Sequence, residues 1–436
     1  MPLPTIPSGN VASALGGAFE VANSCMFNKA DNPELSRSTG DGNERIGNFS
    51  FWWKPAADDS GCIFYSVYVD SNNFFDINCD GSMNFQVRNK ASGSYNMELK
   101  LNRVFRDPSA WYSIIVLIDT TQSTEGNRVK IYINGTQDTS FATSNYPSQN
   151  DDLLMNSNSR TARISSSQDR VHGYLAEFVA IDGTAKVVGD FGEFDDDSPT
   201  IWKPIDVSGL SGDKGVNGFY LDFEDSSALG NCAFGGTDFT VSNLAAGDMC
   251  QDSPTNNFCV MNPLDNYFND ADFSQGNTVI YTNGGAVYTF NTATFFLSAG
   301  RWYWEVKVAA GTNGTGTAYI CGISDEPTAA TSQELGNEGT QWGYYGAGHI
   351  RHNNGNDGSY TTYTAGDVVG VYLDLEDNKL YFSKNGTIEN STGISITAPA
   401  SVAGGGYFPA AGFFDGDASS NSAYFYWKGT VRPLSA

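Results

Sequence analysis

The sequence predicts an all-β protein made of two antiparallel β-sandwiches, an ordered connector and an extended N-terminal arm. Aromatic residues make up 13% of the 436 residues and glycine occurs 48 times, whereas charged residues reach only 17%. Aromatic side chains favour half-buried pleated surfaces, and glycine supplies turns. Apolar residues at helical spacing are nearly absent. Short alternating runs bounded by Gly, Asn, Asp or Ser recur instead, which indicates strands.

The N-terminal arm is assigned to residues 1–15, because three prolines within the first seven residues favour an extended chain. The first sandwich is assigned to residues 16–185. The run WYSIIVLIDT (residues 111–120) alternates and is apolar enough for a central strand. The strands expected in this block are residues 48–55, 61–69, 73–80, 82–89, 111–120, 128–135 and 173–182.

The connector is assigned to residues 186–256 and is expected to pack on the first sandwich. Its apolar residues are too many for a solvated tether, and they include Trp202, Phe219, Tyr220, Leu221 and Phe223. The second sandwich is assigned to residues 257–432. Its expected strands are residues 301–308, 317–324, 367–375, 379–386 and 422–429.

One similar hairpin device occurs in each block. The segments RVKIYINGT (residues 128–136) and NKLYFSKNGT (residues 378–387) both end in Asn-Gly-Thr, and Asn-Gly accepts the positive φ of tight turns. The longer stretch of residues 366–386 predicts a hairpin that forms a spine of the second sandwich. Its alternation places Val369, Val371 and Leu373 on one side of the sheet and Val368, Gly370 and Tyr372 on the other.

Charge and composition argue against several classes of partner. Asp and Glu number 49 against 24 Lys and Arg, a net charge of −25, which disfavours nucleic acid and anionic membrane surfaces. No run of about 18 apolar residues occurs, so no membrane insertion is expected. The N-terminus lacks the pattern of a signal peptide. Seven scattered cysteines without a C-x-x-C pair favour synthesis in a reducing cytoplasm.

The two blocks resemble two known families. Trp111-Tyr112, Asp119, GNRVKIYINGT and GYLAEFVAIDGTA follow the order found in concanavalin A-like, laminin-G-type jelly rolls. GRWYWEVKV and the hairpin of residues 366–386 are similar to the central motifs of SPRY domains, which are also β-sandwiches. The segment around GYYGAGHIRHNNGNDGSY departs from that family, so the peptide-binding residues of other SPRY domains are not transferred to this chain.

The arrangement as a whole also resembles virion proteins of marine tailed, cyanophage-like phages. The arm MPLPTIPSGNVASAL, FGEFDDDSPTIWKP and DSPTNNFCVMNPLDN are among the segments that support this resemblance. It implies a protein that is made in the host cytoplasm and located on the virion, as a tail fibre or a capsid-attached fibre. Other virion proteins and a host cell-surface glycan or receptor are the implied partners. A homotrimer is expected by analogy with fibres.

The segment between Gly343 and Tyr363 is the candidate binding loop. Aromatic rings stack on sugar faces, and Asn and Asp bond hydroxyl groups, so the segment suits a glycan or a protein epitope. The alternative is a surface loop that packs on its own domain or on a neighbouring subunit. The candidate ligand-binding residues are Tyr344, Tyr345, His349, Arg351, His352, Asn354, Asp357 and Tyr360.

No catalytic or cofactor motif is found, and the protein is therefore expected not to be an enzyme. None of the three histidines lies in a recognised catalytic pattern, and His349 and His352 are interpreted as ligand or metal contacts or as solvated loop residues. Asp76 and Asp80 are candidate calcium ligands, because laminin-G-like domains often hold calcium at the sandwich rim. Glu177 and Glu305 are isolated acids, expected to pair with a lysine or a backbone donor.

Three functional hypotheses remain. The first is a non-enzymatic virion-surface protein whose sandwich loops bind the host surface or a glycan. The second is a structural decoration protein that stabilises the capsid. The third is a cell-surface glycan hydrolase, which would need two carboxyl groups facing each other across a cleft.

Overall fold

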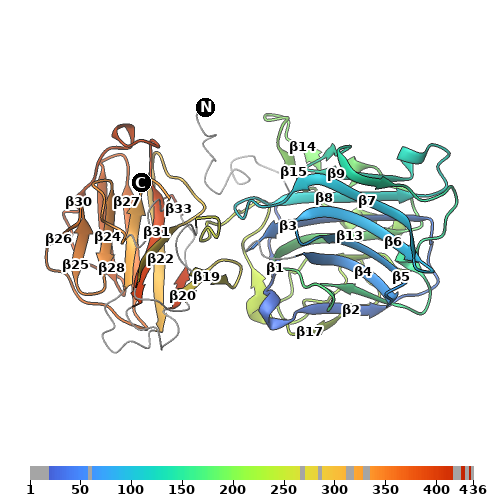
Figure 1. The fold of residues 1–436 in the computed structure, drawn as a ribbon, viewed down its shortest axis with the longest axis horizontal. Helices are drawn as coiled ribbons and strands as arrows, with labels where there is room; N and C mark the ends of the chain where they lie inside the picture. Colours follow the sequence, from blue (N-terminus) through green and yellow to red (C-terminus); the bar gives the residue numbers. More distant parts are fainter. Residues whose placement is uncertain are drawn as a thin grey trace. The chain divides into compact units, whose positions relative to one another are not determined.

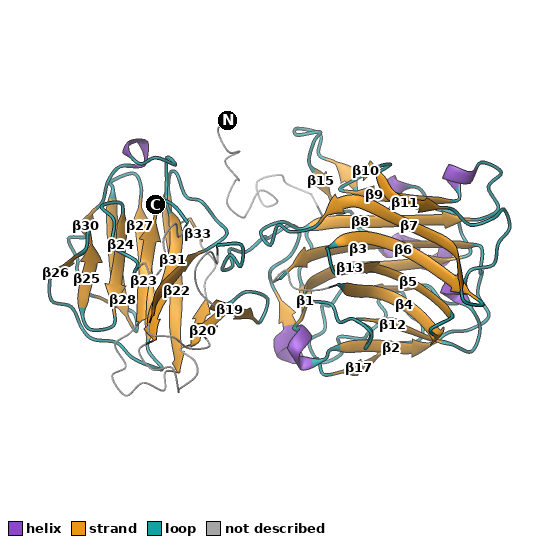
Figure 2. Ribbon diagram, in the orientation of Figure 1, coloured by secondary structure: helices purple, strands orange, loops and turns teal. Residues whose placement is uncertain are grey.

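The computed structural model describes residues 19–56, 61–265, 271–282, 287–310, 319–327, 334–415, 424–427 and 432–433. These residues divide into two compact units, the first within Asn10–Asn257 and the second within Phe258–Ala436. The predicted N-terminal arm lies outside the described residues. Nearly all regular structure in the described part is β-strand, and every strand pairing is antiparallel, so the predicted fold class is confirmed (Figures 1 and 2).

Helical structure in the described residues is limited to short 3₁₀ turns. They are η1 Lys29–Asp31, η2 Glu125–Asn127, η3 Leu154–Asn156, η4 Val188–Asp190, η5 Ser208–Asp213, η6 Ala246–Asp248 and η7 Pro399–Ser401. None of the helices in this part of the chain has the length and apolar character that crossing a membrane requires.

The first unit contains two eight-stranded sheets. The β3 sheet runs in the order β10 (Thr136–Gln137), β9 (Val129–Ile133), β8 (Tyr112–Asp119), β3 (Ile46–Pro55), β13 (Gly173–Asp182), β1 (Ser24–Phe27) and β18 (Met249–Cys250), and β16 (Phe219–Leu221) also pairs with β13. The β4 sheet runs in the order β11 (Phe141–Asn145), β7 (Ser94–Val104), β6 (Asn84–Ala91), β5 (Asn73–Cys79), β4 (Cys62–Asp70), β12 (Thr161–Ile164), β2 (Glu34–Ser38) and β17 (Thr240–Ser242).

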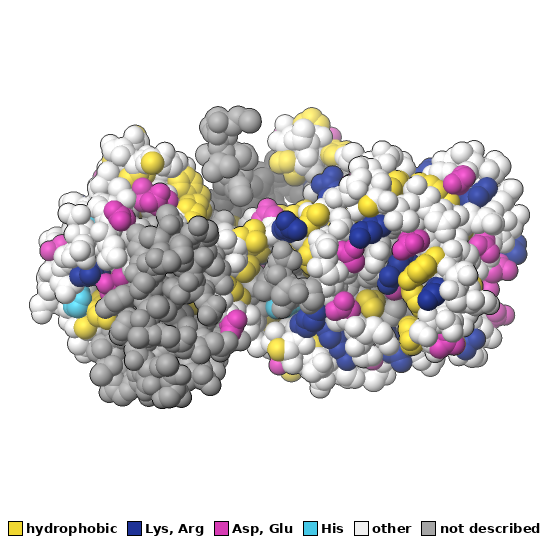
Figure 3. Space-filling view, in the orientation of Figure 1, with side chains coloured by type: hydrophobic (Ala, Val, Ile, Leu, Met, Phe, Trp, Pro, Cys, Tyr) yellow, Lys and Arg dark blue, Asp and Glu magenta, His cyan; other side chains and the backbone are white. Residues whose placement is uncertain are grey.

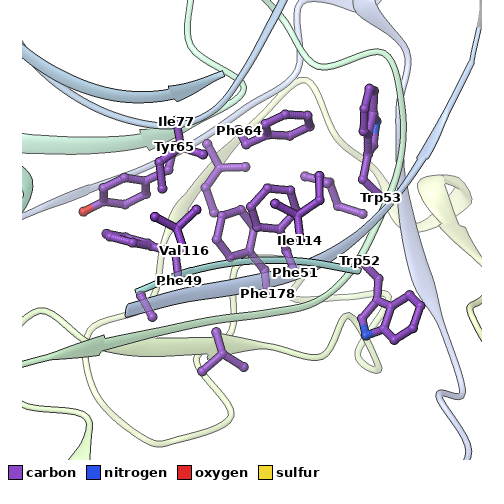
Figure 4. Close-up of a cluster of buried hydrophobic side chains, with 14 of the residues drawn as sticks. Phe49, Phe51, Trp52, Trp53, Phe64, Tyr65, Ile77, Ile114, Val116 and Phe178 are labelled. Atoms are coloured by element: carbon purple, nitrogen blue, oxygen red, sulfur yellow. The ribbon is translucent and has the colours of Figure 1, made fainter. Parts of the chain in front are cut away.

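Aromatic side chains from these two sheets meet in the core of the first unit. The ring of Phe51 on β3 lies 4.8 Å from the ring of Phe64 on β4, and Phe49 lies 4.8 Å from Tyr65 (Figure 4). Burial of apolar surface is the dominant favourable term in folding, and large aromatic rings contribute much of that surface in a core. Strand alternation explains the arrangement, because every second residue of β3 points towards the β4 sheet.

Residues 186–256, the predicted connector, add strands to both sheets of the first unit. Besides β16, β17 and β18, they form the two-stranded pair β14 (Glu193–Phe194) and β15 (Trp202–Lys203). Trp202 donates a hydrogen bond from Nε1 to Oγ of Ser113 on β8 at 3.1 Å, and Phe219 is fully buried in the core of the unit. This part of the chain is therefore folded together with the first sandwich.

The second unit contains two further sheets. The β22 sheet runs in the order β19 (Ala271–Ser274), β20 (Val279–Thr282), β32 (Tyr424–Trp427), β22 (Arg301–Ala310), β27 (Val368–Asp374), β28 (Lys379–Lys384) and β29 (Thr387–Ile388), and β30 (Ile394–Ser395) and β33 (Arg432–Pro433) pair with β28 and β22. The β24 sheet runs in the order β21 (Val287–Thr292), β31 (Phe408–Asp415), β23 (Tyr319–Ser324), β24 (Gln341–Tyr345), β25 (His349–His352) and β26 (Gly355–Asp357).

The predicted hairpin of residues 366–386 is confirmed as β27 and β28, and it lies inside the β22 sheet. Val369, Val371 and Leu373 are buried in the core of the second unit, whereas Val368 and Tyr372 are only half-buried. The Asn-Gly turns are confirmed as well. Asn385 and Gly386 both have positive φ, at 47° and 82°, as a tight two-residue turn requires.

Several strands were not among those predicted from the sequence, and the long β7 is the clearest example. Met97, Leu99 and Leu101 point into the core but alternate with polar and charged residues, so the run is only weakly apolar. On the face of the first unit drawn in Figure 3, Lys and Arg side chains are interspersed with Asp and Glu. This mixture follows from the polar positions of such half-exposed strands.

Candidate binding surface

The candidate segment is a three-stranded meander, β24 to β26, and not the long loop that the sequence predicts. His349, Arg351 and His352 lie on β25, which pairs with β24 on one side and β26 on the other. The turn between β25 and β26 is made by Asn353 and Asn354, both with positive φ. Asn is one of the few residues that accept this conformation readily, so its abundance marks a hairpin turn and not a loop.

Tyr344 is a core residue and not a ligand-binding residue as predicted. Its side chain is fully buried, and its ring lies 4.9 Å from that of Tyr363 and 5.4 Å from that of Phe382 on β28. Its hydroxyl donates a hydrogen bond to the carbonyl oxygen of Thr361. Burial raises the pKa of Tyr344 above its ordinary range, so the hydroxyl stays protonated. The ring joins the two sheets of the second unit and is not accessible to a ligand.

Tyr345 and His349 are direct cross-strand partners on the other face of the β24 sheet. Their rings lie 5.0 Å apart, and both side chains are half-buried. Tyr345 also packs against a small apolar cluster that includes Ile320 and Leu335. Burial, together with the charge of Arg351, lowers the pKa of the His349 imidazole below 6.5, so this ring is neutral at pH 7.

Arg351 stabilises the tip of the β25–β26 hairpin through an ion pair and two side-chain hydrogen bonds. Its Nε lies 2.9 Å from Oε2 of Glu334. Its Nη2 donates to Oδ1 of Asn354 at 2.9 Å, and its Nη1 donates to Oδ1 of Asn356 at 3.0 Å. Burial raises the pKa of Glu334, although the nearby guanidinium opposes that shift. The positive charge of Arg351 is thus balanced by Glu334, which precedes β24, and its donors fix the two amide side chains.

His352 stacks flat on Trp342, with ring centroids 4.5 Å apart and planes inclined by 10°. Its Nδ1 lies 3.0 Å from the carbonyl oxygen of Gln341. Neither histidine lies in a solvated loop, and within the described residues no group of three or more His, Cys, Asp or Glu side chains could hold a metal ion. His352 therefore serves the packing of β24 against β25.

The accessible part of the predicted site is its polar tip. Asn354 and Asp357 are exposed, and so are the neighbouring Asn353 and Asn356. Tyr360 is half-buried, with its ring 5.8 Å from that of Tyr344, so one side of it borders the tip. Amide and carboxylate groups held on a rigid hairpin can bond hydroxyl or amide groups of a ligand.

The two candidate calcium ligands are both engaged with cationic side chains. Asp76 is buried, and its carboxylate accepts two hydrogen bonds from Arg88, at 2.9 and 2.7 Å. Asp80 forms an ion pair with Lys100 and accepts hydrogen bonds from the backbone N–H groups of Ser82 and Asn84. These contacts account for both carboxylates, so we do not assign calcium to them.

The two isolated glutamates are each bonded to a tyrosine, and not to the lysine or backbone donor that was expected. The hydroxyl of Tyr220 donates to Oε2 of Glu177 at 2.7 Å, and the hydroxyl of Tyr303 donates to Oε1 of Glu305. In each pair, the tyrosine and the glutamate belong to the same sheet. Tyr220 is on β16, which pairs with the β13 strand of Glu177. Tyr303 precedes Glu305 by two residues on β22. Each carboxylate thus has a local structural role.

A row of three tyrosines was missed at the sequence level. Tyr303, Tyr372 and Tyr381 lie side by side on β22, β27 and β28, on the face of the sheet opposite to Val371. The alternation of β27 did predict that Tyr372 faces away from Val371. The three rings are aligned by the pairing register of three strands, and that register cannot be predicted from the sequence of any one strand.

The two units are thus sandwich modules that present side chains from rigid strands, and comparison with known proteins identifies both. Residues 43–184 match the family model described as the concanavalin A-like lectin/glucanases superfamily, and residues 301–423 match the SPRY domain model. The chain therefore contains a concanavalin A-like domain and a SPRY domain. Such a pair of domains fits a binding or adhesion role.

Solved structures with partial similarity include the SPRY domain of human HERC1, with 19% identity over 36% of this chain and 89% of that chain, and a TM-score of 0.28. Stonustoxin is 17% identical over 39% of this chain and 26% of that chain, with a TM-score of 0.29. A heptameric SAP-like pentraxin from Limulus polyphemus is 14% identical over 39% of this chain and 81% of that chain, with a TM-score of 0.30.

Proposed function

We propose that the protein is a non-enzymatic binding protein of a phage virion surface, and that its SPRY domain contacts a host-surface glycan or receptor. The observation that supports this most directly is the exposed polar tip of the β25–β26 hairpin, in which Arg351 holds the side chains of Asn354 and Asn356 in place. Groups fixed before binding lose little conformational entropy when a ligand arrives.

The chemistry of the tip favours a ligand rich in hydroxyl groups. The guanidinium of Arg351 is balanced by Glu334, so the tip offers amide groups and the carboxylate of Asp357 without an excess of positive charge. An anionic ligand would gain little there. Sugar hydroxyls, in contrast, can both donate to carboxylate oxygens and accept from amide N–H groups.

The proposed placement on a virion rests on the resemblance of sequence segments such as MPLPTIPSGNVASAL and FGEFDDDSPTIWKP to virion proteins of marine tailed phages. The partners proposed on this basis are other virion proteins and the host surface. A trimer would present three copies of the hairpin tip, which would strengthen a weak contact through multivalency.

The proposal can be tested by competition. Purified protein is added to host cells before the phage, and free particles are counted. We expect the wild-type protein to reduce adsorption, and a variant that carries Asn354→Gly and Asp357→Ala to lose this effect while keeping its melting temperature. Glycine retains the positive φ of position 354. Thr387→Ala, at the exposed start of β29 in the same unit, is the matched control and should compete like the wild type.

The result also separates the alternatives. If neither wild type nor variant affects adsorption, the receptor-binding role is excluded. A drop in the heat stability of particles that lack the protein would then favour a capsid decoration protein. Release of reducing ends from host polysaccharide by the purified protein would instead indicate a glycan hydrolase.

A further inference from the structure

The solvent side of the β22 sheet carries the tyrosine row, which we define as Tyr303, Tyr372 and Tyr381. Tyr303 on β22 pairs directly with Tyr372 on β27, and Tyr372 pairs directly with Tyr381 on β28. Directly paired residues of an antiparallel sheet point to the same face. Because neighbouring strands are about 4.8 Å apart, the row extends about 10 Å across the strands.

The three rings belong to this surface and not to a core. All three side chains are half-buried, whereas Trp304, Val371 and Phe382, which follow or precede them along the same strands, are buried in the core on the opposite face. None of the three tyrosines is part of a core cluster formed by the described residues.

Two glycines give the outer rings of the row their position. A Cβ atom at Gly370 would lie 3.1 Å from Cε2 and from the hydroxyl oxygen of Tyr303. Because glycine has no side chain, the Tyr303 ring can pack against the backbone of β27 at this position. Gly393 has the same relation to Tyr381, because its Cβ atom would lie 2.6 Å from Cζ of that ring. The rings of Tyr303 and Tyr372 are 4.4 Å apart and inclined by 35°. Packing of this kind holds the rings in place before any ligand arrives.

Two of the charged groups that border the row, Arg301 and Glu305, are engaged with neighbouring side chains. Arg301 lies 2.8 Å from Asp374 and within 3.4 Å of both Glu376 and Asp377. Glu305 accepts the hydroxyl hydrogen of Tyr303. Burial, together with the hydrogen bond to Glu305, raises the pKa of Tyr303 above its ordinary range, so the phenol remains neutral. The row therefore offers apolar ring faces, phenolic hydroxyls and one carboxylate. Lys379, which precedes Tyr381 by two residues on β28, adds an ammonium group that donates to Oγ of Ser395.

This combination matches the chemistry of a neutral sugar chain. The C–H faces of sugar rings pack on aromatic faces, and their hydroxyls bond to phenols and carboxylates. A row that crosses three strands suits a linear ligand longer than one ring. A nucleic acid would also stack on aromatic rings, but it requires a positively charged groove along its backbone.

We propose that the tyrosine row is a binding platform for a segment of neutral polysaccharide, separate from the hairpin tip. The inference deepens the proposed binding role, on which it rests, by naming a second site and its class of ligand.

The test uses the full-length protein and affinity electrophoresis in gels that contain laminarin, dextran or mannan, with heparin as the anionic comparison. We expect retardation by at least one neutral polysaccharide and none by heparin. Tyr372→Ala should weaken the apparent affinity about tenfold, and Tyr372→Phe should retain most of it, because the ring supplies the stacking surface. Tyr132→Ala removes a half-buried tyrosine from β9 of the first unit and is the matched control.

Each outcome decides the proposal. Absence of retardation in every neutral gel, stronger retardation by heparin, or equal retardation of wild type and a folded Tyr372→Ala variant would overturn it. If Tyr372→Ala does not fold, Tyr381→Ala at the edge of the row replaces it. Failure of this proposal is distinguishable from failure of the proposed function. The variant with Asn354→Gly and Asp357→Ala could lose adsorption competition while the tyrosine variants have no effect. That result would leave the hairpin tip as a receptor contact and exclude the tyrosine row.

Discussion

Lys54 and Asp252 form an ion pair that is almost completely removed from solvent, with 2.7 Å between Nζ and Oδ2 and side-chain exposures of 0% and 3%. Nζ of Lys54 also donates to Oδ1 of Asn257 at 2.8 Å, and Nε1 of Trp111 donates to Oδ1 of Asp252 at 2.9 Å. These bonds attach the last residues of the first unit to β3 and to the start of β8. The end of the concanavalin A-like unit is thereby fixed by specific polar contacts.

Breaking this pair should destabilise the first unit strongly. Asp252→Ala leaves the Lys54 ammonium buried without its carboxylate, and we expect a loss of about 3–5 kcal/mol in the free energy of unfolding. A double variant with Lys54→Met and Asp252→Asn should lose less, because it buries no charge and keeps an acceptor for Trp111. Urea denaturation followed by tryptophan fluorescence measures both.

The exposed pair of Arg45 and Asp152 provides the control for this prediction. Its side chains are 44% and 55% exposed, although the Nε–Oδ1 distance is only 2.6 Å. Solvent screens such a pair, so Asp152→Ala should leave the midpoint of unfolding unchanged. Equal effects of Asp252→Ala and Asp152→Ala would contradict the assignment of Lys54 and Asp252 as a buried pair.

A charge at Val371 should unfold the SPRY domain. Val371 is fully buried between the two sheets, and Val371→Asp would place a carboxylate there without a partner. We expect a loss of about 4 kcal/mol or more, measured by thermal unfolding. Val368→Asp, a substitution on the half-buried opposite face of β27, is the control and should cost far less. A Val371→Asp protein that melts with the wild type would show that this face is not a core face.

Local patterns predict the strands but not the contacts between distant segments. Lys54 is the penultimate residue of a strand that its apolar neighbours predict, yet its partner Asp252 lies 198 residues further along the chain. Nothing in either segment indicates that the two side chains meet. A lysine at the end of an alternating strand is usually exposed, and only the packed structure shows that this one is buried.

The candidate site shows the same limit on a smaller scale. Gly and Asn between Gly343 and Tyr363 favour a loop, but the alternation of Trp342 and Tyr344 indicates a strand, and tertiary packing follows the alternation. The tyrosine row could not be predicted, because its alignment depends on the register of three strands, of which β22 is distant in sequence from the other two. Composition thus indicates that the domain carries an aromatic and polar surface. The pairing register of the strands determines which residues lie together on that surface.

Glu177 should make the first unit less stable as the pH rises from weakly acidic to weakly alkaline values. Burial raises the pKa of this carboxyl from 4.5 to about 8, and the nearby Asp222, Glu224 and Asp206 add to the shift, while the hydrogen bond from Tyr220 opposes it. Between these two values the unfolded chain releases a proton that the folded protein keeps. The free energy of unfolding therefore falls as the pH rises through this window, by up to about 1.4 kcal/mol per pH unit. Outside the window, Glu177 contributes little to the pH dependence of stability.

The Glu177→Gln variant isolates this effect. Glutamine keeps the shape of the side chain and an acceptor for Tyr220 but cannot ionise, so the variant should gain stability relative to wild type as the pH is raised from 5 to 8. Melting temperatures of both proteins at several pH values provide the measurement. A constant difference across this range would show that Glu177 is ionised in the folded protein at neutral pH.

His349 should titrate below the ordinary histidine range. Burial of the ring against Tyr345 and the positive charge of Arg351 both disfavour the imidazolium, and they lower the pKa of His349 below 6.5. The midpoint is measured from the pH dependence of the imidazole proton resonances by NMR. Arg351→Met should move it upward, because the repulsion disappears and Glu334 loses its counter-charge. Arg301→Met, which removes an arginine from the other sheet, should leave it unchanged. A wild-type midpoint at or above 6.5 would mean that the ring is more solvated than its contacts indicate, and that the hairpin tip gains positive charge under mildly acidic conditions.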